Sequence, residues 1–154
     1  AESVGVGALK YNDLSQNRVH DIRFDWDRML SVTGNSAPYL QYVAVRIKSI
    51  LEKAPMAEKR VKRSTPWTTD EDVLYRSLYR FPEVIQASAE LYEPHHLAEY
   101  LLVLAQEFHR FYDHVPVLNA APAERADYLR LITAVQLTIM EGLRLLGITT
   151  PIRM

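Results

Sequence analysis

The stretch SAPYLQYVAVRIKSIL, from Ser36 to Leu51, has the pattern of a single amphipathic helix. Gly34 and Asn35 interrupt any earlier helix, Ser36 is suited to cap the new one, and a proline is tolerated in its first turn. The apolar residues fall within about 120° of arc, the width of an ordinary core-facing stripe. They are Leu40, Val43, Ala44, Ile47, Ile50 and Leu51. We therefore predict a helix from about residue 37 to residue 53.

Three other side chains of this helix, Tyr39, Tyr42 and Arg46, form a second stripe beside the apolar one. They lie within about 60° of one another and roughly 105° from the centre of the apolar face. One interpretation is structural: the tyrosines flank the core and the arginine extends beside them into solvent. The other is a surface that stacks on unpaired RNA bases with a guanidinium next to it. Spacing alone favours the structural interpretation.

Shorter helices are predicted on both sides of this segment. Residues 4–14 have a helical pattern, residues 21–26 are expected to be irregular or extended, and Asp25 then caps a short helix through Val32. On the far side, Thr69 and Asp72 resemble a capping box. That helix is expected to end near Pro82, with another helix over residues 82–91.

The last two helices carry strong apolar patterns. One is predicted over residues 95–114, between Pro94 and Pro116, and the other from Pro122 to a C-cap at Gly147. The expected core residues are Leu97, Tyr100, Leu101, Leu104, Ala105, Phe108, Phe111 and Tyr112, then Leu129, Ile132, Val135, Leu137, Ile139, Met140, Leu143 and Leu146. The short connections predict an all-α fold, an antiparallel helical bundle.

Composition narrows the class of protein. The chain has 154 residues, no cysteine and a net charge of −1. The absence of cysteine removes disulfides and thiolate metal sites, and fits a reducing, cytoplasmic setting. We see no apolar run long enough for a membrane span and no signal-peptide pattern, and expect no membrane partner. Since nucleic-acid binders that rely on phosphate attraction are usually basic, any RNA contact here must be local.

Motifs for catalysis are not found: the sequence has no phosphate-binding glycine loop, no HExxH and no GxSxG. His95 and His96 are adjacent on a helix, so their side chains are expected to diverge, and His109 and His114 have a poor spacing for shared ligation. We therefore predict neither catalytic residues nor a metal site. The basic run KRVKR, from Lys59 to Arg63, is expected to be a solvated surface loop, with phosphate contact as the alternative.

Several motifs resemble one known family. GNSAPYLQYVAVRIKSIL resembles the start of the helical C-terminal domain of class I arginyl-tRNA synthetases, and VGVGALKYNDLSQNRVHDIRFDWDRML resembles the segment that leaves their catalytic core. EPHHLAEYLLVLAQEFHRFYDHVPVL and the ending GLRLLGITTPIRM are similar to the same family. The similarity covers nearly the whole chain, and is weakest over about residues 54–69. It implies that residues 1–28 are the tail of the catalytic core and residues 29–154 an α-helical anticodon-binding domain.

The resemblance also implies partners and site residues. It identifies Tyr42 and Arg46 with positions that hold anticodon-loop nucleotides, and Tyr112 and Met154 with an apolar platform beneath an anticodon base. Asn35 and Ser36, with Gly34, would belong to a loop that adjusts when tRNA binds, while a role for Tyr39 stays open. The partners are then the anticodon loop of an arginine-accepting tRNA and the rest of the synthetase, and the protein is expected to be monomeric.

The parent enzyme of this family is arginine–tRNA ligase, which joins arginine to its tRNA using ATP and Mg²⁺. Its HIGH-like and KMSK-like motifs are not found in these residues. We therefore expect this chain to need no cofactor of its own, to be inactive alone, and to bind tRNA weakly and in a salt-dependent way. The alternative is a free-standing truncated paralogue that acts as a helical protein- or RNA-interaction module.

Overall fold

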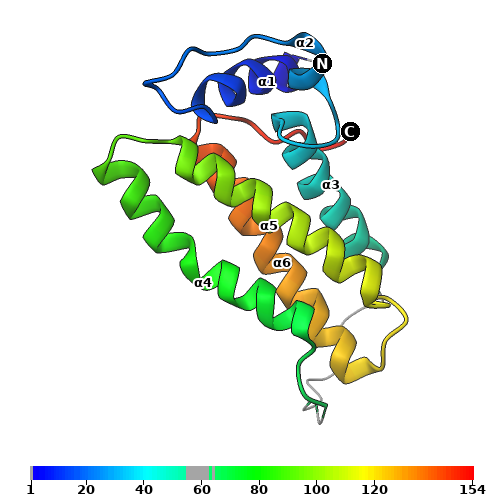
Figure 1. Cartoon of the computed structure of the whole chain (residues 1–154). Coiled ribbons are helices and arrows are strands. Elements are labelled where there is room, and N and C mark those ends of the chain that lie inside the picture. Colours follow the sequence, from blue (N-terminus) through cyan, green and yellow to red (C-terminus); the bar gives the residue numbers. More distant parts are fainter. Residues whose placement is uncertain (1, 55–62, 64) are drawn as a thin grey trace.

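The computed structural model describes residues 2–54, 63 and 65–154, and within these residues it contains six helices and no strand. The helices are α1 (Glu2–Leu14), α2 (Trp26–Leu30), α3 (Ala37–Lys53), α4 (Thr69–Glu90), α5 (His95–His114) and α6 (Pro122–Leu145). Helices α3 to α6 form the bundle, and α1 and α2 cover one end of it (Figure 1). The predicted all-α bundle is confirmed. None of these helices is long and apolar enough to cross a membrane.

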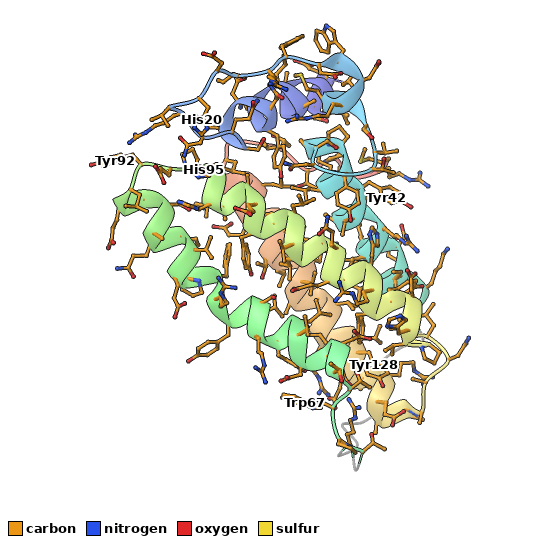
Figure 2. The ribbon with its side chains drawn as sticks, in the orientation of Figure 1. His20, Tyr42, Trp67, Tyr92, His95 and Tyr128 are labelled. Atoms are coloured by element: carbon orange, nitrogen blue, oxygen red, sulfur yellow. The ribbon has the colours of Figure 1, made fainter. Side chains whose placement is uncertain are left out.

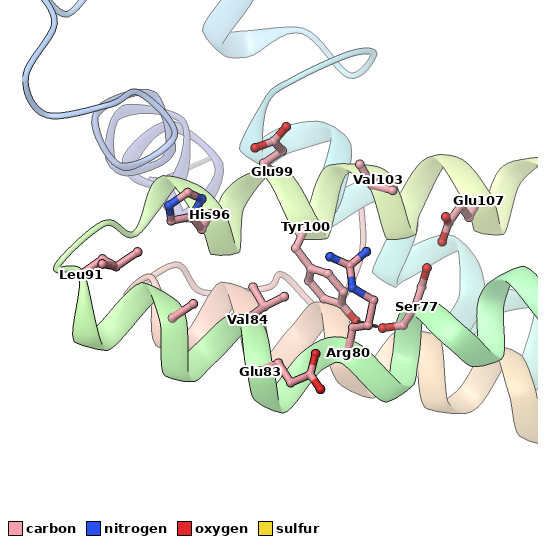
Figure 3. A pocket seen from close by; sticks show the side chains of 11 residues that line it. Ser77, Arg80, Glu83, Val84, Leu91, His96, Glu99, Tyr100, Val103 and Glu107 are labelled. Carbon is pink, nitrogen blue, oxygen red and sulfur yellow. Dashed lines mark hydrogen bonds between the residues drawn. The ribbon is translucent and has the colours of Figure 1, made fainter.

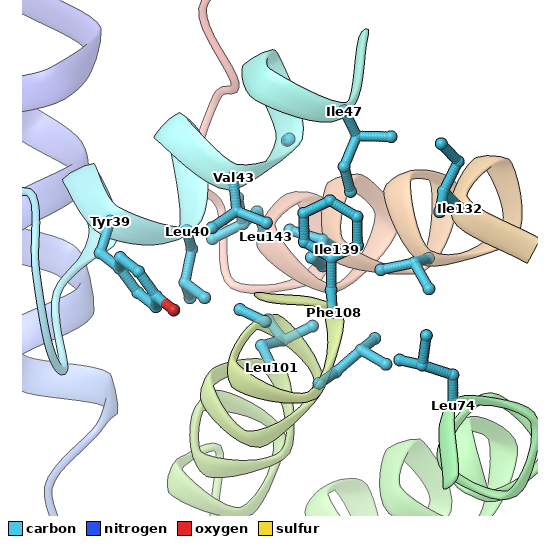
Figure 4. Packing of buried hydrophobic residues seen from close by; sticks show 14 of the residues in the cluster. Tyr39, Leu40, Val43, Ile47, Leu74, Leu101, Phe108, Ile132, Ile139 and Leu143 are labelled. Atoms are coloured by element: carbon cyan, nitrogen blue, oxygen red, sulfur yellow. The ribbon is translucent and has the colours of Figure 1, made fainter. Parts of the chain in front are cut away.

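Helix α5 lies at the centre of the bundle, in contact with α3, α4 and α6 (Figure 1). Its apolar face is fully enclosed, and Leu101, Leu104 and Phe108 have no exposed surface. Figure 4 shows α3 and α6 packed around this face, through residues that include Leu40 and Ile139. Each large side chain buried in this way contributes about 1.5–3 kcal/mol relative to exposure. The bundle is thus organised by one helix that buries its stripe against three others.

The predicted helix boundaries of α3 and α6 are confirmed by their caps. The Ser36 hydroxyl accepts a hydrogen bond from the Tyr39 amide at 3.2 Å, which satisfies a first-turn donor. At the end of α6, Gly147 has a φ of +69° and the Ile148 amide donates to the Leu143 carbonyl at 2.8 Å. That left-handed turn favours glycine because it has no Cβ.

Helix α4 differs from the prediction in two ways. It runs unbroken through Pro82, where two helices were expected, and its N-cap is Thr68 with Glu71 completing the capping box, one residue earlier than predicted. Pro82 lies on the exposed side of the helix. The carbonyl that loses its partner there can therefore bond water, and packing of α4 along α5 offsets the cost of the proline.

Smaller corrections concern α2 and α6. Helix α2 is capped by Asp25 as predicted but ends at Leu30, before Val32. Leu137 and Met140 are exposed, although they were expected in the core. The buried stripe of α6 follows Ile132, Val135, Ile139 and Leu143, as predicted, and Leu137 falls on the opposite side of the helix.

Arg63, the last residue of the basic run, is not a solvated loop residue. Its guanidinium forms a bidentate ion pair with the Glu71 carboxylate, including an Nη2 to Oε2 hydrogen bond of 3.0 Å. The side chains of Arg63 and Glu71 are only 6% and 1% exposed. Lys59 to Lys62 lie outside the described residues, as does most of the 54–69 segment, where the family resemblance is weakest. The expectation of a solvated loop is therefore wrong for Arg63, because it neutralises a buried acid.

We expect Arg63→Ala to destabilise the fold by about 3–5 kcal/mol, because it leaves the Glu71 carboxylate buried without its counter-charge. The matched control is Arg76→Ala, which breaks the exposed Arg76–Asp72 pair on α4, the helix that carries Glu71. It should lower the free energy of unfolding by only about 0–1 kcal/mol. Urea denaturation of both variants measures the difference. Equal, small losses would contradict the assigned role of Arg63.

Candidate functional site

Tyr42, Arg46 and Tyr112 form one surface on neighbouring helices, here named the aromatic–arginine surface. Tyr42 and Arg46 are one turn apart on α3, and Tyr112 lies in the last turns of α5. The Arg46 guanidinium carbon is 5.3 Å from the centre of the Tyr112 ring, within cation–π range. The Tyr42 side chain is 38% exposed and points away from the bundle (Figure 2). Two rings and a planar cation are thus presented beside one another.

Tyr39 does not share this exposure. It is 7% exposed, belongs to the core, and its hydroxyl is hydrogen-bonded to Nδ1 of His109 at 2.9 Å. On the helical wheel Tyr39 projects only about 20° from Ile50, so of the three stripe residues it lies nearest the apolar face. The stripe expected beside the core therefore divides: Tyr39 packs between α3 and α5, and Tyr42 remains at the surface.

His109 is the main residue of this region that sequence reasoning missed. In the sequence it is considered only as a possible metal ligand together with His114, but it is half-buried, and its Nε2 is enclosed without a hydrogen-bond partner among the described residues. Burial, and then the nearby charge of Arg46, lower the pKa of His109, while Asp113 opposes them. Its position beside Phe108, at the edge of the apolar stripe, was the available signal.

The loop before α3 is held by internal hydrogen bonds. Gly34 has a φ of +80°, and the exposed Asn35 accepts a hydrogen bond from the Tyr11 hydroxyl at 2.8 Å through Oδ1. Ser36 is buried, caps α3 and donates its hydroxyl to the Ser31 carbonyl. Asn35 is therefore accessible in this loop, whereas Ser36 acts as a cap that fixes where α3 begins.

The end of the chain, with half-exposed Met154, returns to the start of α3 (Figure 1). The buried Gln41 side chain donates to the Thr149 carbonyl at 2.7 Å and to the Ser3 carbonyl at 3.3 Å. Lys10 also donates to the Gly147 carbonyl at 2.6 Å. The position of the C-terminal segment thus depends on contacts with α1 and α3, which sequence spacing did not reveal.

A groove of about 570 Å³ lies between α4 and α5 (Figure 3), and its lining includes none of the residues of the aromatic–arginine surface. Its lining includes Arg80 and three acids, Glu83, Glu99 and Glu107. The Tyr100 hydroxyl is committed to the Ser77 carbonyl at 2.9 Å. No nucleophile among these groups is paired with a general base, so the groove offers no evident catalytic arrangement.

The expectation that His95 and His96 diverge is wrong. Their ring centres lie 4.2 Å apart, and both side chains approach Glu93. His95 is the first residue of α5, so its side chain is not confined by a preceding turn.

Comparison with known proteins gives one family. The profile of the DALR anticodon binding domain matches residues 40–154. The arginine–tRNA ligase of Prochlorococcus marinus is 43% identical over 154 residues, which are the whole of this chain and 26% of that protein. The chain thus spans about a quarter of the length of the curated relatives it matches.

Solved structures agree with the sequence match. The Thermus thermophilus arginyl-tRNA synthetase superposes with a TM-score of 0.91 at 34% identity, over 99% of this chain and 27% of the other. The arginyl-tRNA synthetase of Plasmodium falciparum gives a TM-score of 0.87 at 28% identity, with the same coverage. The similarity therefore extends through the helical arrangement as well as the sequence.

The lowered pKa of His109 predicts a pH effect on stability. As the pH falls through about 6.5, the ordinary pKa of histidine, His109 takes up a proton in the unfolded chain but stays neutral in the folded chain. Protonation then favours the unfolded chain, so the free energy of unfolding falls as the pH falls. We expect the wild type to lose more unfolding free energy than His109→Asn between about pH 7.5 and 5.5. Urea denaturation at both pH values tests this, and equal losses would contradict it.

Proposed function

The chain belongs to the DALR anticodon binding domain family, and we propose that it is the tRNA anticodon-binding part of an arginine–tRNA ligase. The observation that carries the proposal is the aromatic–arginine surface, in which Tyr42 is open to solvent and the Arg46 guanidinium lies over the Tyr112 ring. Anticodon bases are unpaired, so their faces and edges are available to such groups. The surface combines the two chemistries that hold single-stranded bases.

Each group has a distinct task in this proposal. A base stacked on an aromatic ring gains about 1–3 kcal/mol, and the open ring of Tyr42 is suited to that role. Arg46 is half-buried, and its guanidinium covers one face of the Tyr112 ring. On that side, a nucleotide would therefore contact the guanidinium and not the ring. A planar guanidinium can stack on a base or donate in-plane to a base edge or phosphate. Met154 would add apolar contact from the chain end.

The remaining residues of the predicted site support the surface from within it. Tyr39 and Ser36 are buried, and their hydroxyls are engaged with His109 and with the chain leading into α3. They set where α3 begins and how it packs on α5, and so they position Tyr42 and Arg46. Asn35 is exposed and can contact RNA if its bond with Tyr11 opens.

The overall charge is consistent with this mode of binding. A net charge of −1 gives no general attraction to phosphate, so affinity must come from stacking and from a few local cations. We propose that this part alone binds tRNA weakly, and that firm binding requires the rest of the enzyme. ATP, Mg²⁺ and arginine would be handled there, in a monomeric cytoplasmic protein.

We propose that the remainder of the enzyme also accounts for an exposed apolar surface formed by α2 and the segments on either side of it. Ile22, Phe24, Trp26, Leu30 and Val32 are all about half-exposed, and Phe24 and Trp26 meet edge to face at 4.9 Å. So much apolar surface on one short segment is unusual for a protein without a partner there. We propose that the portion of the enzyme outside these 154 residues docks on this apolar surface.

We expect Tyr42→Ala to weaken binding of an arginine-accepting tRNA anticodon stem-loop about 5- to 150-fold, because one stacked base is lost. The matched control is Tyr79→Ala, which removes an 84% exposed tyrosine of α4. Fluorescence anisotropy measures both. If Tyr42→Ala binds the stem-loop as the wild type does, or if Tyr79→Ala weakens binding equally, the proposed contact between Tyr42 and a base is contradicted.

The docking proposal predicts a change in the environment of Trp26, which is 53% exposed here. Trp67 is the other tryptophan of these 154 residues, so a Trp67→Phe background isolates the Trp26 signal of this chain. In the longer protein, the Trp26 signal is the difference between that background and the same background with Trp26→Phe. Acrylamide should quench Trp26 readily in the 154-residue chain and much less in the longer protein that contains it. Equal quenching in both would mean that nothing covers this surface.

A further inference from the structure

Three potential metal ligands converge where α4 turns into α5. The ligand atoms of Glu93, His95 and His96 all lie within 4.8 Å of one another. His96 Nε2 is 2.9 Å from a Glu93 carboxylate oxygen, and the two imidazole ring centres are 4.2 Å apart. All three side chains are partly exposed, so an ion from solvent can reach them. Figure 2 shows His95 at this corner, next to Tyr92.

A strained turn holds the carboxylate in this position. Helix α4 ends with the Glu93 amide donating to the Ser88 carbonyl at 3.0 Å and the Tyr92 amide donating to the Ala89 carbonyl at 3.3 Å. This ending needs a left-handed residue, and Tyr92, with a φ of +54°, occupies the position that glycine usually takes. A residue with a side chain is strained there because its Cβ comes too close to the following carbonyl oxygen. Pro94 is the N-cap of α5 and restricts the backbone of Glu93, which keeps the start of this side chain close to the two histidines.

We propose that Glu93, His95 and His96 form a binding site for a divalent transition-metal ion, with Zn²⁺ as the ion it suits. Two imidazole nitrogens and a carboxylate oxygen match the borderline preference of Zn²⁺, whereas Mg²⁺ and Ca²⁺ favour oxygen alone. Zinc bonds of about 2.0–2.2 Å require ligand atoms roughly 3.3 Å apart. Metal binding would therefore require side-chain rotations that shorten the present spacing of up to 4.8 Å, and water would complete the coordination.

An ordinary ion pair explains fewer of the observations. A Glu93–His96 pair requires two groups and gives no reason for His95 to approach both of them. The chain contains a pair of that simple kind, His114 with Asp70 at 2.8 Å, and in the part that the structure describes no third ligand joins it. The cluster between α4 and α5 therefore differs from an ordinary histidine–carboxylate pair, because three potential ligands converge there and not two.

The position at the start of α5 opposes a cation only weakly. The helix dipole there disfavours positive charge, but the effect is screened by salt and falls off within the first turn. A bound ion would clip the end of α4 to the first turn of α5, at the end of the α4–α5 groove that His96 borders (Figure 3).

The test is titration of the tag-free, chelator-treated 154-residue chain with Zn²⁺ alone, followed by isothermal calorimetry and thermal unfolding. We expect saturable one-to-one binding, a higher Tm with zinc, and roughly ten- to hundredfold weaker binding in His95→Ala and His96→Ala. Glu93→Gln, which keeps a hydrogen-bonding group beside His96, should weaken binding similarly without disturbing the fold.

The matched control is His114→Ala, which removes the histidine of the two-group pair and should leave zinc binding unchanged. Circular dichroism checks that each variant retains its helices. The proposal is overturned if the wild type shows no saturable binding, if His95→Ala and His96→Ala bind zinc as the wild type does, or if His114→Ala weakens binding as much as they do.

Discussion

Burial of the apolar face of α5 is the interaction on which the rest of the structure depends. Leu101, Leu104 and Phe108 are completely enclosed by α3, α4 and α6. Because α3 packs directly against this helix, its outer side has a fixed orientation, with Tyr42 at the surface and Arg46 over the Tyr112 ring. The same helix carries His109, which ties it to Tyr39. The packing of the core thus fixes the positions of the candidate site residues at its outer edge.

Polar groups at the margins of this core have positioning roles. Ser36 fixes the first turn of α3, Gln41 holds the C-terminal segment, and Arg63 neutralises Glu71 at the start of α4. Removing one partner of such a contact leaves a buried polar group unsatisfied, at a cost of about 1–3 kcal/mol or more. Substitutions far from any RNA contact are therefore expected to affect binding through the placement of α3 and of the chain end.

Sequence periodicity predicted most of the fold because its determinants are local. The caps at Asp25, Ser36 and Gly147 and the bounds of α3 and α5 depend on neighbouring residues, and they are confirmed. The unbroken α4 was missed because packing on α5 outweighs the penalty of Pro82, which no local pattern encodes. Burial of Tyr39 was missed because it depends on a tertiary contact with α5. Convergence of His95 with His96 was missed because His95 lies at the end of a helix. The division at residues 28 and 29 stays a prediction.

The central claim is that α3 and the end of α5 present an RNA-binding surface. The most direct measurement is an NMR titration of the 154-residue chain with an arginine-tRNA anticodon stem-loop. The account predicts chemical-shift changes centred on residues 35–46, Tyr112 and Met154, while the outer face of α4 around Tyr79 stays unchanged. Changes confined to α4 or to the neighbourhood of Arg63, with none at Tyr42 and Arg46, would contradict it.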